Sequence, residues 1–280
     1  MPLKVHHHVS SEMGLFSVTT LVEGTQACIL INPPFLIPDA ESVIEFIKSK
    51  TSKPLVAGIN REYDEKVKYW PSVFGKKNVP SDPSLRKPEV FQYSFFLLPG
   101  DETSPVCLLG PVQGDSIDHT LFWLPIERTI ITGDAVYARS VHAWVEEIET
   151  YDVLHAWRLT LKLIGSLNPT TIIPGHIERG WEPDAKKDLE YMHKYLDLFE
   201  QKIAKPVFVE GKKKPEVDDL YQTFKKAFPD CEKNLDFFLG KMSNAFGEGG
   251  EIWEENCRHP TKDRSRAVLE GFMLEIPKTH

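Results

Sequence analysis

The chain has 280 residues, 41% of them hydrophobic, and a formal net charge of −8. This length and composition allow a sizeable buried core, whereas the negative charge works against nucleic-acid or anionic-membrane partners, which need a basic face. No apolar run approaches the roughly 20 residues of a membrane helix, and the N-terminus lacks the charged-then-apolar pattern of a secretory signal. We therefore expect a cytoplasmic protein that binds neither nucleic acid nor membrane.

The first elements predict a hairpin followed by a β-α-β unit. The β-prone runs "LFSVTTLVEG" and "ACILIN" flank a turn at Glu23-Gly24-Thr25. Asp39 is a reasonable N-cap for the amphipathic helix "AESVIEFIKSK", and "KPLVAGI" returns to a strand. This order places the residues after Ile59 at the C-terminal end of a strand, where loops commonly hold active sites.

The middle of the chain predicts further strands and then helices. A long loop rich in Pro, Ser and Lys is expected from Lys66 to Lys87. Four strand-like runs follow, and after them come a helix, a strand that ends at His176, and a long helix that Pro183 opens. The strand-like runs are "FQYSFFLLPG", "VCLLGPV", "TLFWLP" and "RTIITGD".

The C-terminal part has a different character. After Pro206, the segments "PEVDDLYQTFKKAF" and "EKNLDFFLGKMSNAF" have the spacing of two amphipathic helices, and the role of the tail 247–280 stays open. We therefore predict a main domain at 1–210 and a helical extension at 211–280 packed on it. The apolar faces of these helices suit a core or a homodimer surface.

An acidic cluster follows the predicted β-α-β unit. The six residues Asn60-Arg61-Glu62-Tyr63-Asp64-Glu65 hold three carboxylates and an amide. Carboxylates so close together repel one another in a low-dielectric environment, so they should sit in water, hold a metal ion or perform acid/base chemistry. Three later loops after strands each add a residue of ligand type, namely His119, Asp134 and His176.

Together these segments resemble the metallo-β-lactamase superfamily, which includes lactonases and glyoxalase II-like thioesterases. The resemblance rests on the "TGD" turn at Asp134, the "GH" at His176, and the order and strand-loop contexts between about Gly14 and Lys205. It implies an αββα sandwich with one or two metal ions at one edge. The HxHxDH motif is degenerate, however, because Asn60, Glu62 and Glu65 stand where histidines would be expected.

The resemblance also implies a ligand set. The first metal position would be lined by Asn60, Glu62, His119 and Asp134, and the second by Asp64, Glu65, Asp134 and His176. Four carboxylates and only two histidines make this set rich in oxygen, which favours harder ions over Zn²⁺. We expect one divalent ion (Mn²⁺, Fe²⁺, Mg²⁺ or Zn²⁺), or none.

Further residues near these loops are candidates for substrate contact. Their alternative role is plain packing, which for His142 means a half-buried position between two helices. The candidates are Tyr63, Trp70, His142, Arg179 and Trp181.

Three functions stay open for this scaffold. The first is a hydrolase for an ester, lactone, thioester or amide bond of a small molecule, with Asp64, Glu62, His119 and Asp134 as catalytic residues or ligands. The second is a metal-independent lyase, dehydratase or isomerase that uses the same carboxylates and histidines for proton transfer. The third is a pseudoenzyme or binding module that keeps only the fold.

Overall fold

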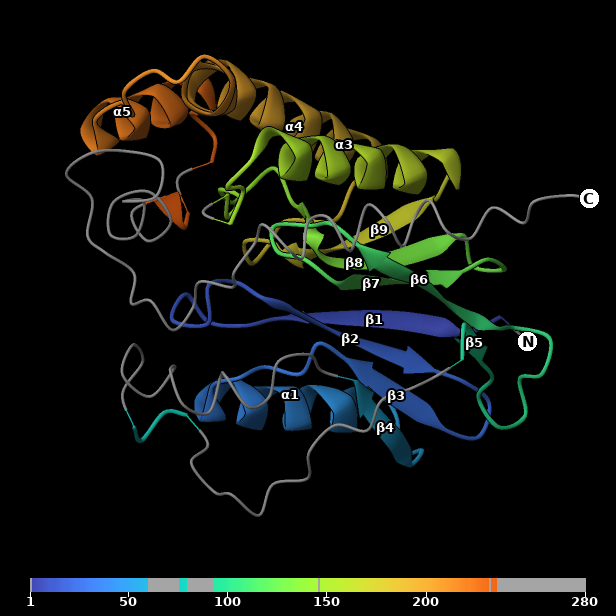
Figure 1. Ribbon diagram of the computed structural model, residues 1–280. Coiled ribbons are helices and arrows are strands. Elements are labelled where there is room, and N and C mark those ends of the chain that lie inside the picture. The colour runs from blue at the N-terminus through green and yellow to red at the C-terminus, as the bar shows by residue number, and fades with distance from the viewer. Residues whose placement is uncertain (1, 60–75, 80–92, 146, 232, 236–280) are drawn as a thin grey trace, which may run out of the picture. The chain divides into compact units, whose positions relative to one another are not determined.

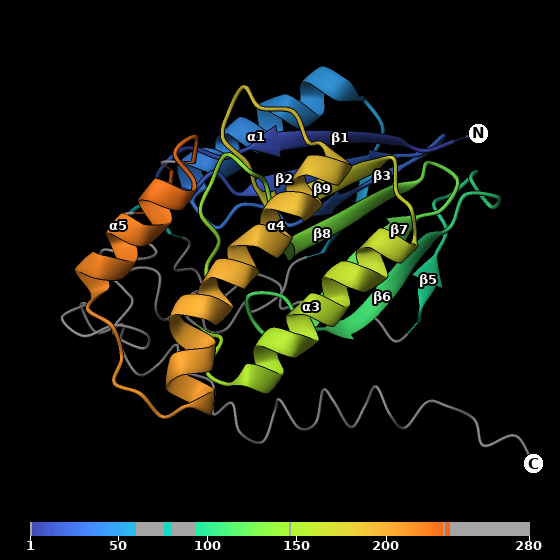
Figure 2. The ribbon, with the colours of Figure 1, turned by 90° about the horizontal axis from the view of Figure 1, so that it is seen from above.

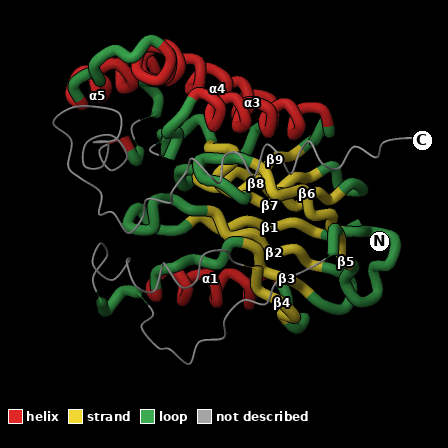
Figure 3. Tube along the Cα trace, in the orientation of Figure 1, coloured by secondary structure: helices red, strands yellow, loops and turns green. Residues whose placement is uncertain are grey.

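The computed structural model describes residues 2–59, 76–79, 93–145, 147–231 and 233–235. The chain forms two compact units. Unit 1 consists of Met1–Leu109, Phe122–Gly133 and Thr170–Pro183, and unit 2 consists of Gly110–Leu121, Asp134–Pro169 and the chain from Asp184 onward. The elements confirm the predicted mixed α/β class, with two sheets and helices (Figure 3). None of the helices in the described ranges has both the length and the apolar character needed to span a membrane.

The first sheet lies in unit 1 and has the strand order β1-β2-β3-β4. Its antiparallel pairs are β1 with β2 and β2 with β3, so the predicted hairpin at Glu23-Gly24-Thr25 is confirmed. Strand β3 pairs with β4 in parallel, which confirms the predicted β-α-β unit. The bounds are β1 Lys4–Val9, β2 Val18–Glu23, β3 Cys28–Ile31 and β4 Leu55–Ile59.

Helix α1 (Ile37–Lys50) connects β3 to β4 and packs on this sheet (Figure 1). Val43 is buried with Leu21, Cys28 and Leu30 of the strands, so the helix contributes its apolar stripe to the core. The predicted N-cap at Asp39 is wrong. The helix begins three residues earlier, at Ile37 after the N-cap Leu36, because a proline in its first turn supplies the required φ. The Asp39 carboxylate instead accepts hydrogen bonds from Ser11.

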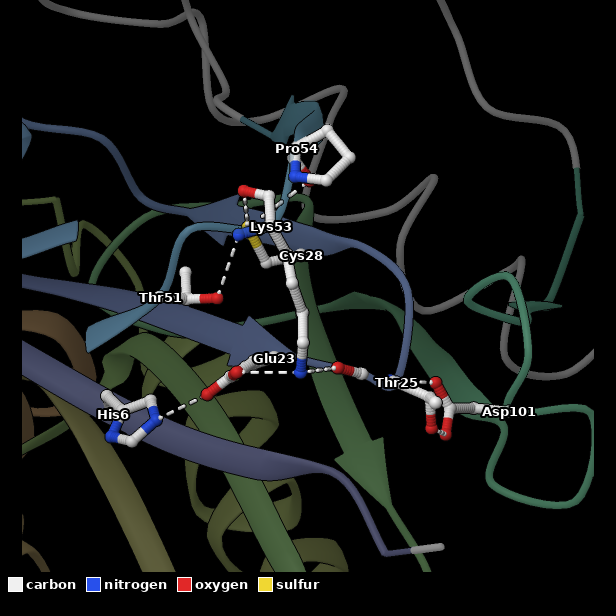
Figure 4. A network of polar contacts seen from close by, with 9 residues as sticks. His6, Glu23, Thr25, Cys28, Thr51, Lys53, Pro54 and Asp101 are labelled. Atoms are coloured by element: carbon white, nitrogen blue, oxygen red, sulfur yellow. Dashed lines mark hydrogen bonds and ion pairs between the residues drawn. The ribbon is translucent and has the colours of Figure 1, made fainter. Parts of the chain in front are cut away.

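A polar network in unit 1 ties the β2-β3 turn to neighbouring segments (Figure 4). The buried Glu23 carboxylate accepts from Lys53 Nζ at 2.8 Å and lies 3.3 Å from His6 Nε2. The bond from Lys53, more than the opposing burial, lowers the pKa of Glu23 to about 2. Asp101 accepts from both the backbone N–H and the hydroxyl of Thr25 at 2.6 Å. The turn is therefore held by charged partners on both sides.

The second sheet has the strand order β5-β6-β7-β8-β9. Antiparallel pairs join β5 to β6 and β7 to β8. Within unit 1, β9 contacts β2, and His176 forms an isolated bridge with Ser17. The bounds are β5 Phe95–Phe96, β6 Val106–Val112, β7 His119–Leu124, β8 Thr129–Tyr137 and β9 Thr171–His176.

Unit 2 is built around helices that pack side by side (Figure 2). Trp157 is fully buried and donates from Nε1 to the Ala135 carbonyl at 2.9 Å, which ties α3 to β8. The buried Asp188 accepts from Arg139 Nη1 at 2.7 Å and so fixes the start of α4. The helices are α3 Tyr151–Ser166, α4 Ala185–Phe199, a π-helical continuation η1 Glu200–Val209, and α5 Val217–Ala227.

The C-terminal helix α5 confirms the first predicted amphipathic helix of this region. It buries Leu220 and Phe224, and Phe224 packs against Tyr195 of α4 with ring centroids 4.9 Å apart. The second predicted helix and the tail lie mostly in 236–280, outside the described residues. The predicted division at 210/211 therefore stays a prediction.

Candidate functional site

The predicted site residues divide into two sets. One set belongs to ranges that the structure describes and the other does not. The described set is His119, Asp134, His142, His176, Arg179 and Trp181. The candidates outside the described residues are Asn60, Glu62, Tyr63, Asp64, Glu65 and Trp70.

A polar cluster in unit 2 is centred on the loop between β6 and β7. His119 begins β7 and is 8% exposed. Its Nε2 lies 3.0 Å from Asp115 Oδ1 and 3.1 Å from Ser116 Oγ. The second oxygen of Asp115 accepts from the Tyr137 hydroxyl at 2.7 Å. The chain thus forms a buried Tyr137–Asp115–His119 series of hydrogen bonds.

Gly114 makes room for the His119 ring. A Cβ atom at position 114 would lie 2.7 Å from Cδ2 and 2.8 Å from Nε2 of His119. Real Cβ contacts are not that short, so any side chain here would displace the imidazole. Asp118 turns the chain back into β7 with a φ of 60°, a left-handed conformation that Asp tolerates better than most residues. The local sequence "GDSIDH" therefore brings Asp115 and His119 together.

Asp115 is the residue that the sequence analysis missed. It is 6% exposed, and burial raises the pKa of its carboxyl, as does the nearby charge of Asp134. The hydrogen bonds from His119 and Tyr137 oppose this rise in the pKa. The signal that could have identified Asp115 is its position four residues before His119, in a loop between two apolar strands.

Asp134 lies inside β8, because the strand continues to Tyr137 without a break. The prediction that Asp134 stands in a loop after a strand is therefore wrong. Its carbonyl faces the Asp115 N–H at 3.4 Å. Burial and the charges of Asp115 and Asp134 raise the pKa of the Tyr137 hydroxyl well above its ordinary value of 10. Tyr137 therefore stays protonated and acts as a hydrogen-bond donor to Asp115.

His176 ends β9 in unit 1. Its Nδ1 lies 2.7 Å from the Leu15 carbonyl, and the Ile177 N–H donates to the Phe16 carbonyl at 3.1 Å. Arg179, in the loop that follows, is exposed and donates from Nε to the Val9 carbonyl at 3.3 Å. Trp181, two positions after Arg179, is half-buried. The substrate roles of Arg179 and Trp181 stay predictions.

His142 is packed in the interior of unit 2, and its role in substrate contact stays a prediction. It is fully buried, not half-buried, and its Nδ1 lies 3.2 Å from the Tyr195 hydroxyl of α4. Phe228 packs edge-on against the imidazole at a centroid distance of 6.2 Å. Burial lowers the pKa of His142 from 6.5 to about 4. A hydrogen bond with the Cys231 backbone raises this pKa by a smaller amount.

The described residues do not by themselves fit a metal centre. They contain no group of three or more His, Cys, Asp or Glu side chains arranged to hold a metal ion. His119 directs Nε2 at Asp115 and Ser116, so that nitrogen is already engaged within the protein. The four remaining predicted ligands belong to the acidic segment Asn60–Glu65, which the structure does not describe. Metal binding therefore stays a prediction for this chain.

Comparison with known proteins finds similar solved structures. No family model and no curated protein matches the chain. A metallo-β-lactamase from Pontibacter korlensis is 17% identical, with a TM-score of 0.47 over 70% of this chain and 95% of that chain. The metallo-β-lactamase IND-7 is 17% identical, with a TM-score of 0.47 over 70% of this chain and 94% of that chain. The DIM-1 metallo-β-lactamase is 15% identical, with a TM-score of 0.42 over 71% of this chain and 98% of that chain. These proteins belong to the superfamily that the sequence motifs resemble.

Proposed function

We propose that this chain is an enzyme that hydrolyses an ester, lactone, thioester or amide bond of a small organic molecule, with His119 as the general base. The observation that supports this proposal most is the hydrogen bond between the buried Asp115 carboxylate and His119 Nε2. An ionised carboxylate can only accept, so it holds the proton on Nε2 and leaves the lone pair of the neutral ring on Nδ1.

The reaction assigned to His119 is the activation of water. No hydrogen bond reaches Nδ1 from the part of the chain that the structure describes. Nδ1 takes a proton from a water molecule while the water oxygen attacks the substrate carbonyl carbon. The bond to the leaving O, S or N atom then breaks, and the same proton passes from Nδ1 to that atom. Asp115 stabilises the transient imidazolium, and Tyr137 holds Asp115 in place.

Ser116 is not the nucleophile in this proposal. In a nucleophilic serine site, the carboxylate and the serine contact opposite nitrogens of the imidazole. Here Ser116 Oγ and Asp115 Oδ1 both lie beside Nε2, at 3.1 and 3.0 Å. One nitrogen cannot donate to the carboxylate and accept from the hydroxyl at the same time. Attack by water therefore suits this geometry better than acyl transfer to serine.

A second candidate function is metal-independent proton transfer in a lyase, dehydratase or isomerase. The burial of Asp115 beside Asp134 supports it, because both raise the pKa of the Asp115 carboxyl, and a carboxyl group with a raised pKa holds and passes a proton more readily. Both functions use His119 as the base. They differ in whether water oxygen ends in the product.

The test is a screen of small esters, lactones, thioesters and amides with the full chain, followed by a variant series on any substrate that turns over. We expect His119→Gln to lower kcat/KM by about 100-fold or more, the usual contribution of a general base. Asp115→Asn should lower it as well, because the amide no longer holds the proton on Nε2. The matched control is His155→Gln, which removes an exposed histidine of α3.

Two further measurements separate the candidate functions. Incorporation of ¹⁸O from labelled water into the product identifies hydrolysis, and its absence during turnover identifies the lyase or isomerase. Turnover that survives a chelator agrees with the His119 mechanism, whereas loss of turnover with chelator assigns the chemistry to a metal ion. Equal activity of His119→Gln and the His155→Gln control would overturn the proposal.

A further inference from the structure

A compact cluster of hydrogen bonds in unit 1 holds the loop that contacts His176. The loop runs from Ser10 to Ser17, between β1 and β2. Asp39, which is 3% exposed, accepts from the Ser11 N–H at 2.8 Å and from the Ser11 hydroxyl at 3.1 Å. Ser11 Oγ in turn accepts from the Gly14 N–H at 3.3 Å. One carboxylate thus holds the start of the loop through both polar groups of a single serine.

The same cluster of hydrogen bonds surrounds Gly14. The Ser10 hydroxyl donates to the Gly14 carbonyl at 2.9 Å and accepts from the Ser17 hydroxyl at 3.0 Å. A Cβ atom at position 14 would lie 2.4 Å from Asp39 Oδ2 and 2.7 Å from Ser10 Oγ. Asp39 could yield only by breaking its bonds to Ser11. Glycine is therefore required at position 14 for space, independent of its backbone freedom.

The loop then passes through an unfavourable backbone conformation. Leu15 and Phe16 have φ values of 60° and 58°, in the left-handed region that side chains with a Cβ seldom adopt. Two consecutive apolar residues do not choose this conformation by themselves, so the surrounding contacts must impose it. Turning the chain here aims the Leu15 carbonyl at His176 and the Phe16 carbonyl at the Ile177 N–H.

The contact with Leu15 determines where the proton of His176 lies. A carbonyl oxygen only accepts, so Nδ1 of His176, at 2.7 Å, must be the donor. The neutral ring is then the Nδ1–H tautomer, and its lone pair is on Nε2. Any proton that a substrate gives to His176, or any cation that this imidazole binds, is received by Nε2.

We propose that Asp39 is a positioning residue for His176. Through Ser11 and Gly14 it shapes the Ser10–Ser17 loop, so that the Leu15 carbonyl holds the imidazole as its Nδ1–H tautomer with Nε2 as the basic nitrogen. Asp39 is 137 positions before His176 in the chain and acts on it only through the Ser10–Ser17 loop. This inference is independent of the hydrolase proposal, which concerns His119.

The test is ¹⁵N nuclear magnetic resonance of the full chain labelled at its histidines, at a fixed mildly alkaline pH where the rings are neutral. The resonances of His176 are identified by their loss in His176→Gln. In the unaltered protein we expect Nδ1 to be the protonated nitrogen and Nε2 the unprotonated one. In Asp39→Ala and Gly14→Ala we expect both signals to move toward the averaged shifts of a ring that exchanges between tautomers.

Matched variants separate positioning from general damage. Asp39→Asn should keep the pattern of the unaltered protein, because its Oδ1 still accepts from the Ser11 N–H and its amide can donate to Ser11 Oγ. Ser42→Ala removes a hydroxyl from the same helix, one that contacts His8 at 3.1 Å and not the loop, and should also keep it. If Asp39→Ala does not fold, Ser11→Ala replaces it, since it removes only the hydroxyl bonds.

A proton on Nε2 in the unaltered protein would overturn the assignment. A pattern that survives in every folded Asp39, Gly14 and Ser11 variant would overturn the role of Asp39. None of these readouts needs a substrate, so failure of the hydrolase proposal and failure of this inference can be told apart.

Discussion

Protonation of His142 is expected to destabilise this protein by roughly 3 kcal/mol. The ring is fully buried against Tyr195 and Phe228, with its pKa lowered from 6.5 to about 4. Each pKa unit corresponds to about 1.4 kcal/mol of difference between the folded and unfolded states, which gives the stated figure. Between pH 6.5 and about 4, the unfolded chain binds a proton at this position that the folded chain does not.

A histidine with a lowered folded-state pKa contributes its full stability above pH 6.5 and loses it as the pH falls toward 4. The variant His142→Gln has no titrating group here, so its stability lacks this dependence. The difference in unfolding free energy between the unaltered protein and His142→Gln should therefore shrink by roughly 3 kcal/mol from pH 7.5 to about pH 4.

The assay is urea unfolding of both proteins across this pH range. Other histidines with lowered pKa, such as His7, His8 and His193, titrate in both proteins and cancel in the difference. His155→Gln, an exposed site on α3, serves as the control and should track the unaltered protein. A difference that stays constant, or grows on acidification, would refute the argument that burial controls this group.

Three further substitutions test the contacts that hold the fold together. Glu23→Gln should lower the free energy of unfolding by about 1.5–3 kcal/mol in urea near pH 7, because the amide loses the charge-assisted bond to Lys53. Since the pKa of Glu23 is about 2, this loss should fade as the pH drops from 4.5 toward 2. Arg139→Met should lower the free energy of unfolding by about 3 kcal/mol, since it leaves the fully buried Asp188 without its cation. An unchanged midpoint of urea unfolding would contradict this. Trp157→Phe should cost about 1–3 kcal/mol, because the Ala135 carbonyl loses its donor, and thermal unfolding measures the loss.

Several local elements could be read from the sequence because their signals are local. The hairpin turn at Glu23-Gly24-Thr25 and the parallel unit around α1 follow from β-prone runs and an amphipathic helical repeat. The same local signals predict the wrong start for α1. Asp39 looks like an N-cap in sequence, but its carboxylate is taken by Ser11, 28 positions earlier, which no local pattern encodes.

The candidate site shows the same division. The position of His119 beside a strand makes it a candidate in the sequence, whereas nothing indicates its partner Asp115, because "GDSIDH" does not reveal which side chains the loop turns inward. The role of Leu15 was equally hidden, since a backbone carbonyl has no signature in an amino-acid sequence. Residue types and periodicity determined which elements form and which groups are available for chemistry. Only the tertiary structure decided which groups meet, because hydrogen bonds between distant segments depend on backbone paths that local propensity does not specify.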